Sequence, residues 1–100
     1  MAVIPTGKTI LAPSDDVVSR EIDGELVIVP LDAGVGDVDD LFTLNDTGAA
    51  VWELLDGERT LAEVVDDVAR RFDAPRSEVE VDVLDFAADL VARGFAVEQP

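Results

Sequence analysis

Hydrophobic and β-branched residues gather in two early runs, residues 17–22 and 25–29, that are separated only by Asp23 and Gly24. A two-residue Asp-Gly connection between such runs is typical of a β-hairpin with a type I′ turn, because both positions tolerate a positive φ. Pro30 follows the second run and has no backbone N–H for a ladder, so it ends the strand. The pattern predicts two antiparallel strands.

The segments on either side of this hairpin are less regular. Residues 1–16 contain prolines and a glycine but no sustained period, which predicts a flexible N-terminal arm. After the hairpin, a polar connection with two glycines, residues 32–40, leads to a short third strand, Leu41–Leu44. We therefore expect an arm over 1–16 and a single folded domain over 17–100.

Apolar residues at helical spacing predict three helices in the second half of the chain. Their start signals are Asn45 for the first helix, a Thr60–Glu63 capping box for the second and a Ser77–Glu80 capping box for the third. Gly57 and Gly94 are suited to the left-handed position that ends a helix. Strands followed by helices indicate an α+β, winged-helix-like domain, in which an N-terminal three-stranded antiparallel sheet precedes three helices.

The third helix, residues 78–93, is apolar around most of its circumference. Its polar residues form one narrow stripe: Glu78, Asp82, Asp85, Asp89 and Arg93. The usual core face consists of Val79, Val83, Phe86, Ala87 and Leu90. Further apolar residues continue beyond it: Val81, Leu84, Ala88, Val91 and Ala92. The helix is therefore either buried between other elements or in a homodimer, or it is one wall of a groove that accepts another chain.

The third strand can supply the second wall of such a groove. A short strand at a sheet edge presents free backbone donors and acceptors to which an extended peptide can add itself. The alternative is that the edge is merely short and uncovered. Peptide binding is our first interpretation of this pattern.

Composition narrows the function classes. The chain of 100 residues has 23 acidic and 7 basic residues and a formal net charge of −16, so a phosphate backbone is repelled and nucleic acid is not an expected partner. It has no cysteine, histidine or tyrosine, which removes the commonest nucleophile, general base and soft metal ligands and favours a reducing cytoplasm. We expect no enzyme activity, no cofactor, no metal and no membrane span.

A family resemblance supports peptide binding. The segment Leu44–Gly57 reads LNDTGAAVWELLDG and resembles the LN-x-TG-A-x-(V/I)-W-x-LLDG signature of the PqqD-like proteins, also called RiPP recognition elements. The residues Val81–Phe86 and Arg93–Phe95 are similar to the third helix and exit of that family. The resemblance extends over about residues 17–97.

Members of that family are winged-helix-like, non-catalytic peptide chaperones. The resemblance implies that the leader of a ribosomally made precursor peptide adds as a strand and is presented to a modifying enzyme, often of the radical SAM type, as in the biosynthesis of pyrroloquinoline quinone (PQQ). It implies contacts on the third strand and the outer face of the third helix: Leu41, Phe42, Thr43, Leu44, Val81, Leu84, Asp85 and Ala88.

Two points stay open at this stage. The hairpin and the long connection differ from those of dedicated PQQ producers, so the product is undetermined. The competing class is a structural or regulatory homodimerisation module that uses its apolar third helix as its own interface. An acyl-carrier-like protein shares the small acidic character, but this chain lacks the expected Asp-Ser-Leu attachment motif.

Overall fold

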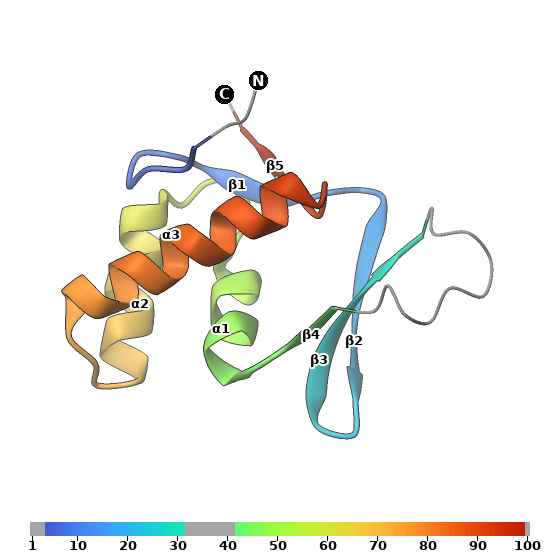
Figure 1. Ribbon diagram of the computed structural model, residues 1–100, viewed down its shortest axis with the longest axis horizontal. Helices are drawn as coiled ribbons and strands as arrows, with labels where there is room; N and C mark the ends of the chain where they lie inside the picture. Colours follow the sequence, from blue (N-terminus) through green and yellow to red (C-terminus); the bar gives the residue numbers. More distant parts are fainter. Residues whose placement is uncertain (1–3, 32–41, 100) are drawn as a thin grey trace.

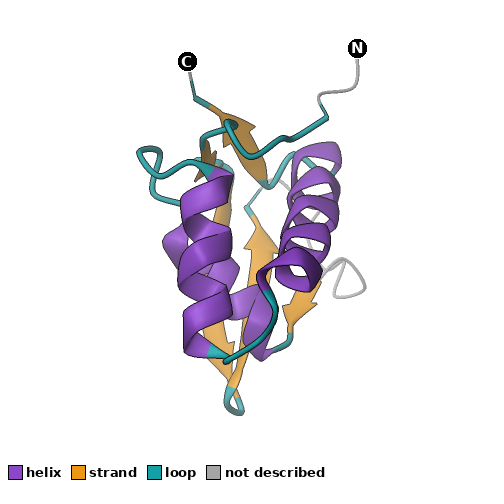
Figure 2. Ribbon diagram, turned by 90° about the vertical axis from the view of Figure 1, so that its left-hand side faces the viewer, coloured by secondary structure: helices purple, strands orange, loops and turns teal. Residues whose placement is uncertain are grey.

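The protein is an α+β domain, seen in a computed structural model that describes residues 4–31 and 42–99 (Figure 1). Its strands are β1 (Leu11–Pro13), β2 (Val17–Ile22), β3 (Glu25–Pro30), β4 (Phe42–Leu44) and β5 (Ala96–Glu98). Its helices are α1 (Asp46–Leu54), α2 (Leu61–Arg71) and α3 (Arg76–Ala92). The predicted order, a small sheet followed by three helices, is confirmed. Seen from the side, the helices lie toward the viewer and the strands behind them (Figure 2).

The predicted hairpin is present. β2 and β3 pair antiparallel from Val17 opposite Pro30 to Ile22 opposite Glu25. Asp23 (φ 53°) and Gly24 (φ 82°) both have positive φ, as a type I′ turn requires. β3 also pairs with β4, so the three-stranded sheet has the order β2-β3-β4.

Helix start signals were predicted correctly for α1 and α2. The side chain of Asn45 accepts the backbone N–H of Gly48 at 2.8 Å, which caps α1. Thr60 and Glu63 form the reciprocal capping box of α2.

The predicted cap of α3 was wrong. The helix begins at Arg76 with Pro75 as its N-cap residue, and no side chain caps it. The Pro75 carbonyl accepts the backbone N–H groups of Glu78 and Val79, each at 3.1 Å, so Ser77 is already inside the first turn. Pro75 has φ −60° and ψ 131°, the extended conformation of an N-cap residue. Its carbonyl accepts the first helical hydrogen bonds, so the helix begins before Ser77.

The two helix ends predicted from glycine residues differ in how well they agree with the structure. Gly94 (φ 76°) directly follows the last cap residue of α3, Arg93, as expected. α1 instead ends at Leu54 with Leu55 as its cap residue, so Gly57 (φ 80°) lies in the connection after the helix. The positive φ was predicted correctly, whereas the extent of α1 was overestimated.

The N-terminal arm differs from the sequence expectation. Within residues 1–16, β1 pairs antiparallel with β5, and Leu11 is fully buried in the core. The Leu11 carbonyl also accepts the backbone N–H of Gly57 at 3.0 Å. A three-residue strand is too short to show a period, and its partner lies at the other end of the chain, so sequence pattern alone did not reveal it.

The core joins all three helices to the sheet. Its fully buried large side chains are Leu11, Ile28, Leu61, Leu90, Val51, Val64, Val65, Val68 and Val83. Every helix and strand contributes to the buried cluster or to its partly buried margin, and β2 does so only through Val17 at its start. Close packing of this kind fixes the position of α3 relative to β4.

One exposed carboxylate stabilises the turn between α1 and α2. Asp56 accepts the backbone N–H groups of Arg59 and Glu58 at 2.9 and 3.0 Å, and these bonds lower its pKa below the ordinary value of 3.8. Because the pKa is lowered in the folded state, this contribution to stability is present above pH 3.8 and is lost as the pH falls through the lowered value.

Candidate binding groove

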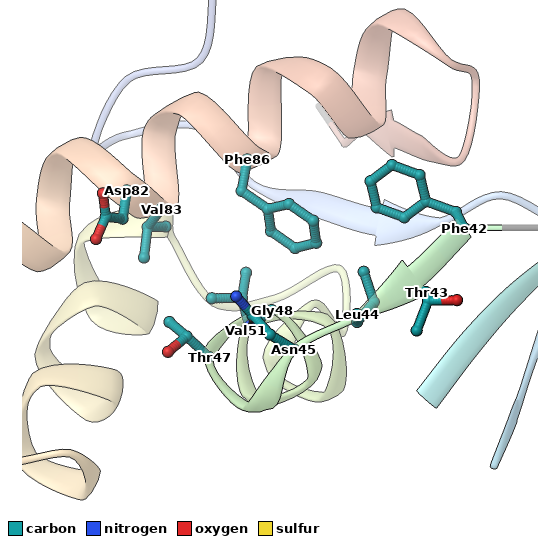
Figure 3. Close-up of a pocket in the computed structure, with 10 residues that line it drawn as sticks. All are labelled: Phe42, Thr43, Leu44, Asn45, Thr47, Gly48, Val51, Asp82, Val83 and Phe86. Carbon is teal, nitrogen blue, oxygen red and sulfur yellow. Dashed lines mark hydrogen bonds between the residues drawn. The ribbon is translucent and has the colours of Figure 1, made fainter. Parts of the chain in front are cut away.

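A cavity of about 430 Å³ lies between β4, the first turns of α1 and one side of α3 (Figure 3). Its lining residues are Phe42, Thr43, Leu44, Asn45, Thr47, Gly48, Val51, Asp82, Val83 and Phe86. The apolar members come from all three elements, and Asp82 is the charged residue among them. We call this cavity the β4–α3 groove.

Aromatic side chains form one end of the groove. The ring of Phe42 stacks on that of Phe86 with centroids 6.3 Å apart and meets Phe95 edge-on at 5.9 Å. The guanidinium carbon of Arg93 lies 4.5 Å from the centre of the Phe42 ring, within the range of a cation–π contact. The Nε of Arg93 also donates to the Oδ1 of Asp89 at 3.1 Å. This end is therefore aromatic, and the Arg93 guanidinium against Phe42 connects it to the C-terminal end of α3.

A glycine makes the middle of the groove close-fitting. A Cβ added at Gly48 would lie 3.5 Å from the ring tip of Phe86 and 3.2 Å from the Oδ1 of Asn45. A larger side chain at this position would fill the groove and press on the cap of α1. The small residue keeps α1 near Phe86 while leaving the space between them open.

The direction of the β3 backbone groups follows from the ladder with β2. In an antiparallel pair, hydrogen-bonded and non-hydrogen-bonded residue pairs alternate. The backbone N–H of Leu31 donates to the Asp16 carbonyl at 2.7 Å, one register step beyond the end of the ladder. Every second residue of β3 counted from Leu31 therefore bonds to β2. The residues between them, including Leu26 and Ile28, direct their N–H and C=O groups toward β4.

This alternation identifies the free backbone groups of β4. Leu44 and Phe42 lie opposite Leu26 and Ile28, so these two residues of β4 bond to β3. Thr43 lies between them and directs its N–H and C=O away from β3. Since β4 is the last strand of the described sheet, Thr43 presents one donor and one acceptor at its open edge.

The sequence-predicted residues of the third strand lie at the groove. Phe42, Thr43 and Leu44 all line it, and Leu44 is buried while Thr43 is exposed. Leu41, the fourth predicted residue, lies outside the described residues.

The sequence-predicted residues of α3 lie elsewhere on the helix. Val81, with 58% of its surface exposed, and the exposed Asp85 do not line the cavity. Leu84 and Ala88 are half-buried, and Leu84 packs against the core. These four residues are not brought together with β4 around the cavity.

Three other residues of α3 line the groove instead: Asp82, Val83 and Phe86. The helical pattern placed Val83 and Phe86 on the core face and Asp82 on the polar stripe. The groove lies where that core face meets that stripe. The helical periodicity predicted where the core face of α3 ends and its polar stripe begins. Only the position of β4 in the folded protein shows that the cavity lies at this line.

The described residues offer no grouping of three or more histidine, cysteine, aspartate or glutamate side chains that could hold a metal ion. Over the same part of the chain, no helix is both long enough and apolar enough to cross a membrane. What the groove does present is backbone hydrogen-bonding groups, apolar surface and the carboxylate of Asp82.

Fold and groove together define a small winged-helix-like domain with an open sheet edge beside a helix. The chain belongs to the family described as Coenzyme PQQ synthesis protein D (PqqD), whose model matches residues 25–96. This match confirms the resemblance found in the sequence.

The chain is also similar in sequence to curated PqqA binding proteins. The chain is 33% identical over 54 residues to the PqqA binding protein of Rhodopseudomonas palustris (strain HaA2), covering 54% of this chain and 53% of that protein. It is 40% identical over 50 residues to the PqqA binding protein of Rhizobium meliloti (strain 1021), covering 50% and 51%. The chain thus spans about half the length of the curated relatives it matches. These relatives are named as binding proteins.

Two solved structures share the fold. TbiB1 in complex with the TbiA(β) leader peptide is 32% identical, with a TM-score of 0.70, and the match covers 85% of this chain and 93% of that one. The NMR structure of the PqqD truncation of Methylobacterium extorquens PqqCD, described as a stand-alone RiPP recognition element, has a TM-score of 0.73 at 21% identity. That match covers 93% of this chain and 94% of that one, and it supports the fold alone.

Proposed function

We propose that this protein binds the leader segment of a ribosomally made precursor peptide by β-strand addition in the β4–α3 groove. The observation that carries the proposal is the open edge of β4, where Thr43 presents its backbone N–H and C=O beside the cavity between β4 and α3. Two findings on similar proteins support the same ligand class: the curated relatives are PqqA binding proteins, and TbiB1 forms a complex with a leader peptide.

The geometry of strand addition assigns roles to the residues of β4. A peptide residue that pairs with Thr43 can exchange two backbone hydrogen bonds with it. Side chains alternate across a strand, so the two neighbouring peptide residues point to the face of Phe42 and Leu44, toward Phe86. The contacts implied by the resemblance at Val81, Leu84, Asp85 and Ala88 remain a separate proposal, reached only if the peptide continues over the outer face of α3.

The proposed role is recruitment without catalysis. The protein would present the bound leader to a modifying enzyme, with a radical SAM enzyme as the first candidate and the product left open. The proposal includes a cytoplasmic location, which the absence of cysteine favours. No cofactor or metal is part of it.

An NMR titration of labelled protein tests the ligand. Peptides from short reading frames near the gene are added while the amide signals of β4 and α3 are followed. We expect shifts in these two elements and slower hydrogen exchange of the Thr43 amide. Unchanged signals at millimolar concentration for every such peptide would contradict the proposal.

Thr43→Pro tests the mode of binding. Proline removes the outward N–H of β4 but no bond of the β3–β4 ladder, so the fold is retained while strand addition is weakened. Loss of this hydrogen bond and crowding by the ring are expected to weaken peptide binding about tenfold.

Thr43→Val is the matched control, because it keeps the backbone N–H and the preference for a strand. Both variants should keep the amide spectrum of α2 and α3. Equal peptide affinity of the two folded variants would rule out strand addition at Thr43.

Self-association is the second candidate. Val81 is 58% exposed on α3, and Val97 is 49% exposed on β5, so apolar side chains outside the groove are available to a second copy. A concentration series in analytical ultracentrifugation distinguishes the candidates. A tight dimer that does not respond to leader peptide would favour a homodimerisation module, whereas a monomer that binds peptide would favour recruitment.

A further inference from the structure

The β4–α3 groove has chemically different ends. Phe42 lies at the end near Phe86 and Arg93. Figure 3 shows Asp82 at the opposite end, on the same side as Thr47 of α1. An extended ligand that follows β4 toward α1 therefore moves from an aromatic end to a carboxylate.

Asp82 belongs to a row of carboxylates along α3. Glu78, Asp82 and Asp85 are all exposed, and none of them has an ion-pair or hydrogen-bonding partner among the described residues. Asp89, the next acidic residue of the row, is already paired with Arg93. We call these three unpaired carboxylates the acidic rim: Asp82 lines the groove, whereas Glu78 and Asp85 lie outside the cavity on the same polar stripe of α3.

The spacing of the rim suits an extended peptide. Residues four apart on a helix are separated by about 6 Å along its axis, and alternate residues of a strand by about 6.6–6.8 Å. A strand that places one side chain against Phe86 can therefore place the next side chain of the same row near Asp82. A carboxylate in the ligand would meet like charge there, and the net charge of −16 adds to this repulsion.

We infer that the leader segment recognised by this protein is basic as well as apolar. It has apolar side chains at the two alternating positions that face Phe42 and Phe86. It has Lys or Arg at the following positions, toward α1, where the acidic rim receives them. This inference rests on the proposed strand addition and specifies the chemistry of the ligand.

Three synthetic peptides test it. They share one apolar strand-forming core and carry Lys, Gln or Glu at the positions that follow the core. Affinity is measured by fluorescence anisotropy at low and high NaCl, and hydrogen exchange at Thr43 reports strand addition independently. We expect the Lys peptide to bind at least about fivefold more tightly than the Glu peptide, the size of one or two partly exposed ion pairs. The difference should shrink at high salt because exposed charges are screened.

A rim variant and a matched control locate the effect. The rim variant combines Glu78→Gln, Asp82→Asn and Asp85→Asn. The control combines Asp15→Asn, Glu58→Gln and Glu98→Gln, which neutralise three exposed carboxylates outside the groove. The rim variant should lose the preference for Lys and still bind the Gln peptide, whereas the control should keep the preference.

The outcomes separate the two proposals. Equal affinity for the Lys and Glu peptides, with Thr43 protected by both, overturns the charge inference and leaves strand addition intact. A Lys preference that both triple variants lose equally also overturns it, because it would reflect net charge only. Failure of all three peptides to protect Thr43, together with failure of the leaders encoded near the gene, overturns both proposals.

Discussion

Asn45 links the stability of α1 to the shape of the groove. Its Oδ1 caps α1 through the Gly48 N–H at 2.8 Å, and the residue also lines the cavity between β4 and α1. The same side chain would lie 3.2 Å from a Cβ added at Gly48. The Leu-Asn-Asp-Thr-Gly segment therefore places a capping residue, a glycine and the end of the open strand together.

Asn45→Ala should lower the free energy of unfolding by about 1 kcal/mol, because the Gly48 N–H loses its acceptor. Urea denaturation of the variant and the parent protein measures the difference. Asn45→Asp is the matched control, since its carboxylate also caps a helix and should retain most of the stability. A loss of equal size in both variants would show that the amide contributes something other than the cap.

At the scale of elements, β1 is part of the core although it lies in the segment expected as an arm. Leu11 is fully buried, whereas Ile4 in the same segment is 81% exposed. β1 joins the end of the chain through β5, and β5 follows α3 directly. The position of α3 beside β4 thus depends on a contact between the two ends of the domain.

Leu11→Ala should lower the free energy of unfolding by about 2–5 kcal/mol, because it leaves a cavity among well-packed side chains. Ile4→Ala removes an equally large apolar side chain from an exposed position and should change stability by less than about 0.5 kcal/mol. Thermal or urea denaturation of both variants gives the comparison. If Leu11→Ala were as silent as Ile4→Ala, β1 would not contribute to the stability of the domain.

At the scale of the whole molecule, the excess of negative charge dominates the electrostatics. The ion pairs of the described residues are exposed at the surface, and such pairs contribute little each. Repulsion among 23 acidic residues, opposed by 7 basic ones, should therefore exceed the attraction.

Raising NaCl from 20 to 500 mM should increase the midpoint of thermal unfolding by about 3–5 °C, because salt screens the repulsion more than it weakens the few pairs. KCl at the same concentrations is the control for specific sodium binding, and screening predicts an equal increase. A midpoint that falls with both salts would show that attraction dominates.

Much of the fold was predictable because its signals are local. The Asp23–Gly24 turn, the Asn45 cap and the Thr60–Glu63 capping box each depend on residues within one turn of the chain. The start of α3 was predicted less well, because Ser77 and Glu80 match a capping pattern while Pro75 begins the helix through its carbonyl.

One wall of the groove was predictable from the sequence, and the other was not. The edge strand and its residues Phe42, Thr43 and Leu44 follow from the order of the elements. The groove-lining residues of α3 do not, since Val83 and Phe86 share the spacing of core residues and Asp82 that of a solvated stripe. Which side of α3 faces β4 depends on packing against α1, α2 and β5.

The sequence by itself determined the β2–β3 hairpin, β4, the three helices and their order, because turns, caps and periodicity act over a few residues. The resemblance of the segment Leu44–Gly57 indicated the family and, together with the apolar third helix beside a short edge strand, the ligand class we propose. The tertiary structure alone decided that β1 joins the core, that Thr43 presents the free backbone groups of the edge, and that Asp82, Val83 and Phe86 face the groove. These features are contacts between residues far apart in the chain, and their geometry exists only once the helices and strands have packed together.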